Sequence, residues 1–356
     1  MKFLHTSDLH IGSPLTSRLS QEKARERKGE LMSNLERMIE EAVYQRATAF
    51  IIAGDMFDSE KITKHTAERV VSAIEKYPNL DFLYLSGNHE KNALINCGVA
   101  IPKNLKMFGE DWTYFNYGEV CIAGRSKISP DMFSSLDLAY EKTNIVVLHG
   151  ALSDAKTGGE IIGRKDATQK HIDYLALGHY HSYSEHQIDD TGIAVYAGTP
   201  EGRGFDEVGE KGFVMIEADG RHARHRFIPF AKRRLHIIDV DLTDAEGRSD
   251  INERVEKSLL GIPYTDLVRV RLCGKKSPEL FADEDSIVSR WQNSFYHFEI
   301  KDETSLKIDP EDYKYDRSLK GEFIRLVASK SDLSDKEKDD IIRVGLAALM
   351  GECDEI

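Results

Sequence analysis

The chain has 356 residues, 40% of them hydrophobic and 31% charged, which is the composition of an ordinary globular protein with room for more than one domain. No apolar run approaches the roughly 18 residues that a membrane span needs, and the start turns polar too early for a signal peptide, so we expect a cytoplasmic protein. The formal net charge of −13 argues against nucleic-acid binding through overall positive charge, but leaves room for a local basic cluster.

The first 230 residues alternate apolar strand-like runs with amphipathic helical stretches. The runs at 49–53 and 145–148 are apolar throughout, which is typical of strands buried on both faces. The order strand, helix, strand, helix, strand indicates a layered α/β domain, and the later strands indicate a second sheet, packed as a sandwich with helices outside. We expect strands at 2–7, 49–53, 81–86, 145–148, 174–177, 193–196 and 213–216, short β segments over 105–124, and helices at 21–46 and 63–77.

The pattern changes near Lys232-Arg233-Arg234, where a small α+β unit without obvious chemistry begins. A charged, aperiodic stretch at 302–316 is typical of a linker, and Ser334 with Glu337 predicts a capping box for the last helix. We expect strands at 235–242, 266–272 and 296–300, and helices at 250–260, 284–291, 319–329 and 335–350. The predicted parts are a first domain at 1–231, a capping domain at 232–305, and a linker with C-terminal helices at 306–356.

Five short polar clusters each follow a strand-like apolar run. Carboxylate, imidazole and carboxamide groups are ligands for borderline divalent metals, and none of the clusters contains a thiolate. Residues so far apart in sequence can meet where a sheet aligns the carboxyl ends of its strands. The clusters are Asp8-Leu9-His10, Gly54-Asp55, Gly87-Asn88-His89, His149-Gly150 and Gly178-His179-Tyr180-His181.

Each cluster alone is weak, because a lone DxH or HxH is more often a turn or a surface pair. All five together, in order within 181 residues, predict a two-metal centre that acts on phosphate esters. Asp55 is the expected bridging carboxylate, and Asp8 and His10 can bind one ion from the same side of an extended chain. His179 and His181 can divide between the ions, while Asn88 offers an oxygen and His149 a nitrogen. His89 is not an obvious ligand and is placed to protonate the leaving oxygen.

The series resembles the calcineurin-like metallophosphoesterases, whose pattern runs DxH, GDxxD, GNH(D/E), H and GHxH. Within that superfamily the chain looks like the SbcD-type nuclease subunits of bacterial DNA repair, especially the YhaO-like branch. The entry FLHTSDLHIG, the block YAGTPEGRGFDEVGEKGF and the helices after SLKGEF support this resemblance. Glu90 is a departure, because many relatives have aspartate there. The resemblance implies a four-layer α/β sandwich of two mixed sheets flanked by helices.

The resemblance also implies the cofactors and partners. Manganese is the implied metal, although the ligands themselves permit Mn, Fe or Zn, and His89 corresponds to the catalytic histidine. The implied partners are DNA and an SMC-like ATPase subunit of the SbcC or YhaN kind, with a homodimer left open. The terminal helices either dock the ATPase or pack within this chain. The resemblance implies two ligand sets that share Asp55: Asp8, His10, Asp55 and His181 for one ion, and Asp55, Asn88, His149 and His179 for the other.

We therefore expect a metal-dependent DNA phosphodiesterase, an SbcD-like exonuclease or endonuclease subunit that uses a two-metal-activated hydroxide. One alternative is a phosphoesterase for a small cyclic nucleotide or dinucleotide, and another is a non-catalytic scaffold for an SMC-like ATPase. A basic cluster bears on this choice, since it is either a DNA contact or a solvated strand face. Its members are Arg221, Arg224, Arg226, Lys232, Arg233 and Arg234.

Overall fold

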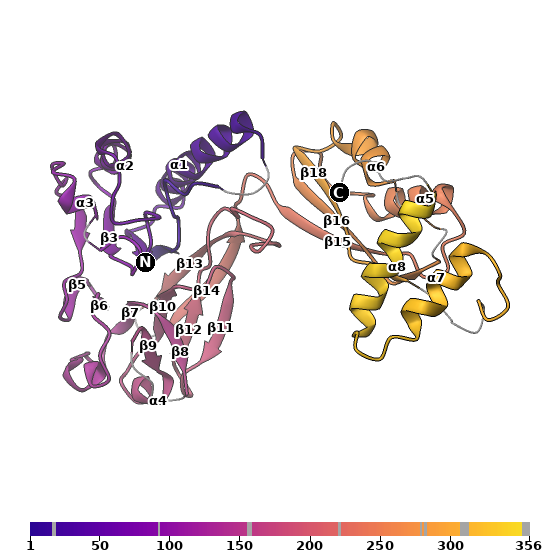
Figure 1. Ribbon diagram of the computed structural model, residues 1–356. Coiled ribbons are helices and arrows are strands. Elements are labelled where there is room, and N and C mark those ends of the chain that lie inside the picture. Colours follow the sequence, from indigo (N-terminus) through magenta and orange to yellow (C-terminus); the bar gives the residue numbers. More distant parts are fainter. Residues whose placement is uncertain are drawn as a thin grey trace. The chain divides into compact units, whose positions relative to one another are not determined.

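The computed structural model describes residues 1–15, 19–91, 93–154, 159–219, 222–277, 280, 283–306 and 313–350 (Figure 1). The chain divides into two compact units, Met1–Arg234 and Leu235–Ile356. The finer boundaries expected from the sequence, a capping domain at 232–305 and a separate part at 306–356, stay predictions. Among the residues described, no helix is both long and apolar enough to cross a membrane.

The first unit contains two six-stranded mixed sheets. In the first sheet, four parallel strands (β1 to β4) are extended on one side by the antiparallel strands β13 and β14. Its strand order is β14 (Ala223–Pro229), β13 (Gly212–Ala218), β1 (Lys2–Thr6), β2 (Ala49–Ala53), β3 (Asp81–Leu85) and β4 (Leu105–Met107).

The second sheet has a parallel centre and an antiparallel strand at each edge. Its order is β11 (Ser184–Gln187), β12 (Ile193–Tyr196), β10 (Tyr174–Gly178), β7 (Thr143–His149), β6 (Val120–Gly124) and β5 (Thr113–Tyr117). A small parallel pair, β8 (Ala151–Ser153) and β9 (Ile161–Gly163), follows β7.

Side chains along each central strand of the first sheet alternate between an outer core under the helices and an inner core between the two sheets. Helices outside two packed sheets give the fold four layers. Leu4 of β1 packs toward α1 (Gln21–Tyr44) and α2 (Lys64–Glu75), which cover the outer face of the first sheet (Figure 1). Its neighbour Phe3 packs between the sheets, since successive strand residues face opposite ways. The second sheet has its own outer core, to which the 3₁₀ turn Met132–Ser135 and α4 (Arg164–Ala167) contribute. The predicted fold class, two mixed sheets flanked by helices, is confirmed.

Side-chain caps mark the start of the two long helices of the first unit. Ser20 Oγ accepts a hydrogen bond from the Lys23 amide at the start of α1, and Thr63 does the same for Thr66 at the start of α2. A further short helix, α3 (Ala93–Asn96), follows the third polar cluster. Both long helices lie within two residues of the predicted ranges.

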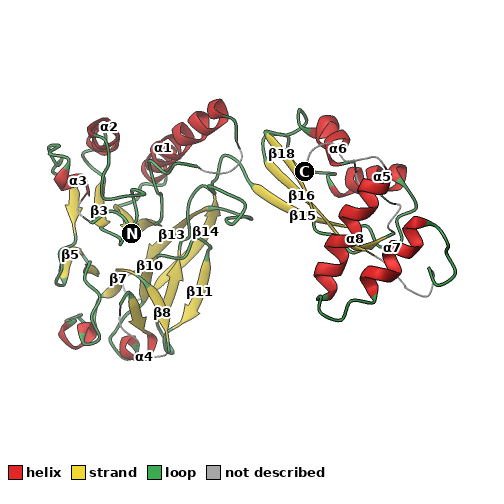
Figure 2. Ribbon diagram, viewed as in Figure 1, coloured by secondary structure: helices red, strands yellow, loops and turns green. Residues whose placement is uncertain are grey.

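The second unit is built on a three-stranded parallel sheet of β15 (Leu235–Asp241), β16 (Leu267–Cys273) and β18 (His297–Asp302) (Figure 2). Helices α5 (Arg248–Ser258) and α6 (Glu284–Trp291) connect these strands and pack on them. The short strands β17 (Lys275–Lys276) and β19 (Ser305–Leu306) form a separate pair. The predicted linker lies partly outside the described residues, at 307–312.

The chain continues into α7 (Leu319–Ala328) and α8 (Asp335–Met350), which pack on one another. The Ser334 amide donates to the Glu337 carboxylate at 2.8 Å and the Glu337 amide donates back to Ser334 Oγ at 3.4 Å, so the predicted capping box is confirmed. Ile342 and Leu346 of α8 are buried against Ile324 and Val327 of α7.

Candidate metal centre

The predicted site residues follow the carboxyl ends of five strands, three in one sheet and two in the other. Asp8, Asp55 and Asn88 follow the parallel strands β1, β2 and β3. His149 ends β7 and pairs in register with Gly178, the last residue of β10. Parallel strands end at a common edge, so the sandwich brings residues that are up to 173 positions apart in sequence to one place.

Two groups of three side chains have ligand atoms within 4.8 Å of one another. One group is Asp8, His10 and His181, and the other is Asp8, Asp55 and His149. Asp8 therefore belongs to both groups, whereas Asp55 was the carboxylate expected to be shared. Asp55 Oδ2 is nevertheless central, because it lies 3.3 Å from His149 Nε2 and 4.0 Å from His10 Nε2.

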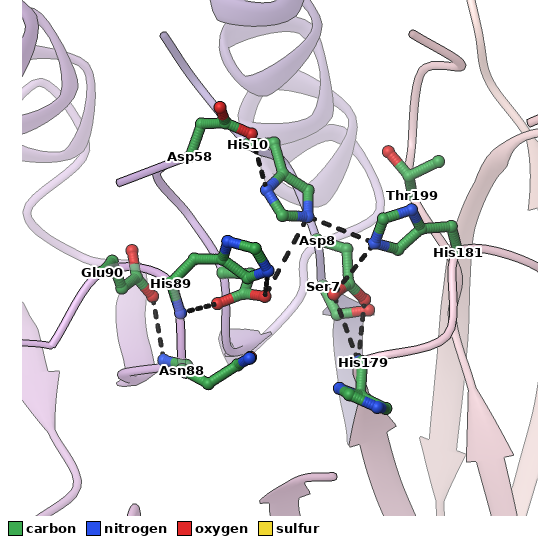
Figure 3. Close-up of polar contacts among 12 residues, drawn as sticks. Ser7, Asp8, His10, Asp58, Asn88, His89, Glu90, His179, His181 and Thr199 are labelled. Atoms are coloured by element: carbon green, nitrogen blue, oxygen red, sulfur yellow. Dashed lines mark hydrogen bonds and ion pairs between the residues drawn. The ribbon is translucent and has the colours of Figure 1, made fainter. Parts of the chain in front are cut away.

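The histidine rings are held so that Nε2 faces the centre. His149 Nδ1 donates to the Ala53 carbonyl at 2.9 Å, which fixes the proton on that nitrogen. His181 Nδ1 donates to Glu207 Oε1 at 2.7 Å. The pKa of Glu207 falls to about 2, because hydrogen bonds from His181 and Arg203 outweigh the effect of burial. Figure 3 shows His10 and His181 turned toward one another beside Asp8.

The donor set fits a pair of cations. With its proton on Nδ1, His149 presents a lone pair at Nε2, only 2.9 Å from Asn88 Oδ1 and 3.3 Å from Asp55 Oδ2. Three acceptors at such distances repel unless a positive charge lies among them. When no ion is bound, a second proton on Nε2 supplies that positive charge. Burial opposes this protonation, but the hydrogen bond to Asp55 and the charges of Asp8 and Asp55 raise the pKa of His149 to about 9. The Nε2 atoms of His10 and His181 are 3.2 Å apart, which suits two ligands that are each about 2.0–2.1 Å from one ion.

The backbone of the site is strained. Asp8, His10, Asp55 and His179 have φ values of 53°, 45°, 51° and 110°, in the region that side chains other than glycine rarely occupy. Hydrogen bonds hold this conformation: the His10 amide donates to the Asp55 carbonyl, and the His179 amide donates to both oxygens of Asp8 at 3.1 Å. Such strain persists only where the surrounding structure imposes it, and it concentrates at functional sites.

Two glycines of the clusters are required by close approach. A Cβ on Gly54 would lie 2.1 Å from His149 Nδ1, and Gly54 itself has a φ of 92°. A Cβ on Gly87 would lie 2.1 Å from Asp55 Oδ1. The glycines before Asp55 and Asn88 therefore leave room for the side chains that face the centre.

The three remaining candidates lie around these groups. Asn88 contacts His149 as described, while the ring of His179 lies 5.6 Å from that of His149 and its nitrogens belong to neither group of three. His89 lies at the rim, with 52% of its side chain exposed and Nε2 4.0 Å from Asp55 Oδ2. Its amide donates to Asp55 Oδ1 at 3.1 Å. The assignment of each residue as ligand or catalyst stays a prediction.

Four charged residues support the site, and the motifs alone assigned them no role of this kind. Glu90 is fully buried and accepts hydrogen bonds from the amides of Met56, Phe57 and Gly87, so it joins the loops after β2 and β3. Burial is the main reason why its pKa rises to about 7. The other three are Asp58, Arg203 and Glu207, which contact His10 and His181. The signal for them was present, since they lie in the GDxxD motif and the 196–213 block.

Comparisons with other proteins place this site in a known context. The chain is 23% identical over 278 residues to the uncharacterized metallophosphoesterase YhaO of Bacillus subtilis, covering 72% of this chain and 67% of that protein. It is 22% identical over 342 residues to the DNA double-strand break repair protein Mre11 of Sulfurisphaera tokodaii, covering 86% and 84%.

Two solved structures match the chain at low similarity. TT1561 of Thermus thermophilus matches with a TM-score of 0.41 and 11% identity over 64% of this chain and 98% of that one. A dimetal phosphatase from Danio rerio matches with a TM-score of 0.36 and 9% identity over 65% and 99%. The family model for calcineurin-like phosphoesterases matches residues 1–183, which contain all five polar clusters, and the chain belongs to this family of metallophosphoesterases.

Proposed function

We propose that this protein is a manganese-dependent phosphodiesterase that cleaves DNA, as an SbcD-like nuclease subunit. The observation that carries the proposal is the pair of overlapping ligand groups that share Asp8, with His89 exposed beside them. The chemistry that two divalent ions supply when bound is to clamp a phosphoryl group, lower the pKa of a water and offset charge on the leaving oxygen.

The residues of the chain divide the remaining work. Asp8, Asp55, His10, His149 and His181 would hold the ions, and the buried carboxylates Asp8 and Asp55 supply the negative charge that balances them. Asn88 and His179 are the further ligands we propose, close to His149. His89 is free to reach a substrate because half of its side chain is exposed, and we assign it the proton that the leaving oxygen requires.

A polyanionic substrate is favoured by a pocket beside the site. This pocket of about 530 Å³ is lined by Ile11 and Gly12, which follow His10, and by Asp58. Four cationic side chains line it as well and outnumber the carboxylate of Asp58, and an excess of one sign of charge in a cleft concentrates substrates of the opposite sign. They are Arg25, Lys28, Lys61 and Arg69. The similarity to a relative named as a DNA double-strand break repair protein supports the same substrate.

Three side chains of the basic cluster form ion pairs within the chain, so the cluster offers less positive charge than a DNA contact would need. Lys232 and Arg233 both pair with Glu30 at 2.8 Å, and Arg234 pairs with Glu210 at the same distance. Arg224 and Arg226 are exposed on the edge strand β14, while Arg221 lies outside the described residues. This observation favours the second candidate function, a phosphodiesterase for a small cyclic nucleotide or dinucleotide.

Manganese-dependent turnover of a single-stranded oligonucleotide, bis-p-nitrophenyl phosphate and cyclic nucleotides separates the two candidates. We expect cleavage of the oligonucleotide, and preference for a cyclic nucleotide without DNA cleavage would reject the nuclease. In the same assay His89→Ala should lower kcat by about 10²–10⁴-fold while both ions stay bound. The control is His186→Ala, because His186 is an exposed histidine on β11. Full activity of the His89 variant would remove the role we give it.

We propose an SMC-like ATPase as the partner, docked on the terminal helices. Side chains on α7 and α8 remain 40–68% exposed although both helices are amphipathic: Leu319, Leu326, Ile341, Val344 and Leu349. Co-expression with the ATPase followed by affinity capture should recover a complex that Leu326→Asp and Val344→Asp weaken. If these variants instead dissolve a homodimer and leave the complex intact, the face serves self-association.

A further inference from the structure

The histidines of the two ligand groups differ in what fixes their rings. His149 is held by a main-chain carbonyl, that of Ala53. His10 and His181 are held by carboxylates from elsewhere in the chain, Asp58 and Glu207. A side-chain substitution can remove a carboxylate but cannot remove the Ala53 carbonyl, so the two groups should respond differently to mutation.

Arg203 joins the two carboxylates into one connected chain of contacts. Its Nη1 donates to Asp58 Oδ1 at 2.9 Å, and its Nη2 donates to Glu207 Oε1 at 2.6 Å. Asp58 Oδ1 lies 3.1 Å from His10 Nδ1, although this contact lacks the alignment of a hydrogen bond. The series His10, Asp58, Arg203, Glu207, His181, which we call the belt, therefore passes behind both rings.

Hydrogen bonds and neighbouring charges keep the carboxylates of the belt ionised. Glu207 is 4% exposed and also accepts from the Arg203 amide at 2.7 Å, so its carboxylate makes hydrogen bonds to three separate donor groups. The charges alternate along the belt, which keeps both carboxylates ionised and able to accept from an imidazole N–H. Lys211 adds a further tie, since its Nζ donates to the His181 carbonyl at 2.7 Å. Because His181 Nδ1 donates to Glu207, the lone pair at His181 Nε2 faces the centre. His10 Nδ1 lies 3.1 Å from Asp58 Oδ1, so the ring of His10 is oriented in the same way by an electrostatic contact.

We propose that Asp58, Arg203 and Glu207 are positioning residues that set the affinity of one ion, the one bound by His10 and His181, and leave the other ion unaffected. This inference rests on the metal centre of the proposed function, and it assigns to part of the 196–213 block a specific task there. Carboxylates that orient metal-binding histidines typically change metal affinity by 10–100-fold.

Calorimetric titration of Mn²⁺ into the EDTA-stripped full-length chain tests the proposal. We expect two binding events in the wild-type protein, and in Glu207→Gln a rise of about 10–100-fold in one dissociation constant only. Asp58→Asn should weaken the same event by a smaller factor, because its contact with His10 is poorly aligned. Glu207→Asp keeps the charge and should recover part of the affinity. The electron paramagnetic resonance signal of bound Mn²⁺ provides the second readout. At limiting Mn²⁺, the spectrum of Glu207→Gln should lack the signal of the site formed by His10 and His181.

Glu210→Gln is the matched control. Glu210 lies on the same loop and pairs with Arg234, but its side chain is 54% exposed and contacts no histidine of the centre among the described residues. Thermal melting in EDTA identifies general damage, and if Glu207→Gln does not fold, Asp58→Asn carries the test. The proposal would be overturned if Glu207→Gln and Asp58→Asn left both dissociation constants unchanged. It would also be overturned if these variants raised the dissociation constants of the two ions equally. A wild-type protein that binds no ion would instead reject the proposed function, and the belt with it.

Discussion

Replacing Glu201 by alanine should destabilise the first unit strongly, although Glu201 contacts no predicted ligand. Its side chain is fully buried, and its two oxygens accept from Arg27 Nη1 at 2.8 Å and from Asn34 Nδ2 at 3.0 Å. They also accept from the amides of Lys232 and Arg233, close to the end of the unit. The substitution leaves Arg27, which is 1% exposed, and two amides without this acceptor.

The size of this loss in the free energy of unfolding depends on which ion pairs remain after the substitution. Removing one partner of a buried ion pair costs about 3–5 kcal/mol, because the other charge stays buried. Arg27 keeps Glu30 at 2.6 Å and Arg233 keeps the same carboxylate at 2.8 Å, so the loss belongs at the lower end. We expect about 3 kcal/mol, which for a unit of this size lowers Tm by roughly 6–12 °C.

Urea unfolding in a Trp291→Phe background measures this loss, because Trp112 then reports on the first unit alone. Glu210→Ala is the control, since its exposed ion pair with Arg234 should contribute about 0–1 kcal/mol. A loss of less than about 1 kcal/mol for Glu201→Ala would show that the buried network is energetically neutral in sum, as some buried ion pairs are. That result would refute the reasoning from unpaired charge.

Two further predictions concern the glycine before Asn88 and the buried His5. Gly87→Ala should abolish high-affinity Mn²⁺ binding in calorimetry, because the added Cβ would displace the Asp55 carboxylate; retained binding of both ions would contradict this. Burial lowers the pKa of His5 to about 3. Between pH 6.5 and 3 the unfolded chain therefore binds a proton that the folded protein does not, and the free energy of unfolding decreases as the pH is lowered through this range. His5→Leu should flatten this slope by up to about 1.4 kcal/mol for each pH unit, measured by urea titration in EDTA, and an unchanged slope would refute the assignment.

The fold and the edge that carries the site were predictable because their signals are local. Buried strands read as short apolar runs, and each cluster of the site follows its strand within a few residues. The belt could not be found in this way. Glu207 is 26 positions from His181, and Arg203 is 145 positions from Asp58, so only the folded chain shows that these charges meet. Motif letters marked Asp58 and the 196–213 block as notable without indicating which rings they hold.

The sequence indicated the candidate ligands but not how they divide between the two groups, because the backbone at several of these residues is not extended. The expectation that residues i and i+2 share a face assumes extended chain, whereas Asp8, His10 and His179 have positive φ. Asp8 and His10 still reach one group because the loop after β1 is tied to the loop after β2, through the Asp8 amide to the Gly54 carbonyl and the His10 amide to the Asp55 carbonyl. His179 turns its amide to Asp8, and its ring joins neither group. Strand periodicity therefore locates the site, and the strained turns decide which side chains come together in each group of three.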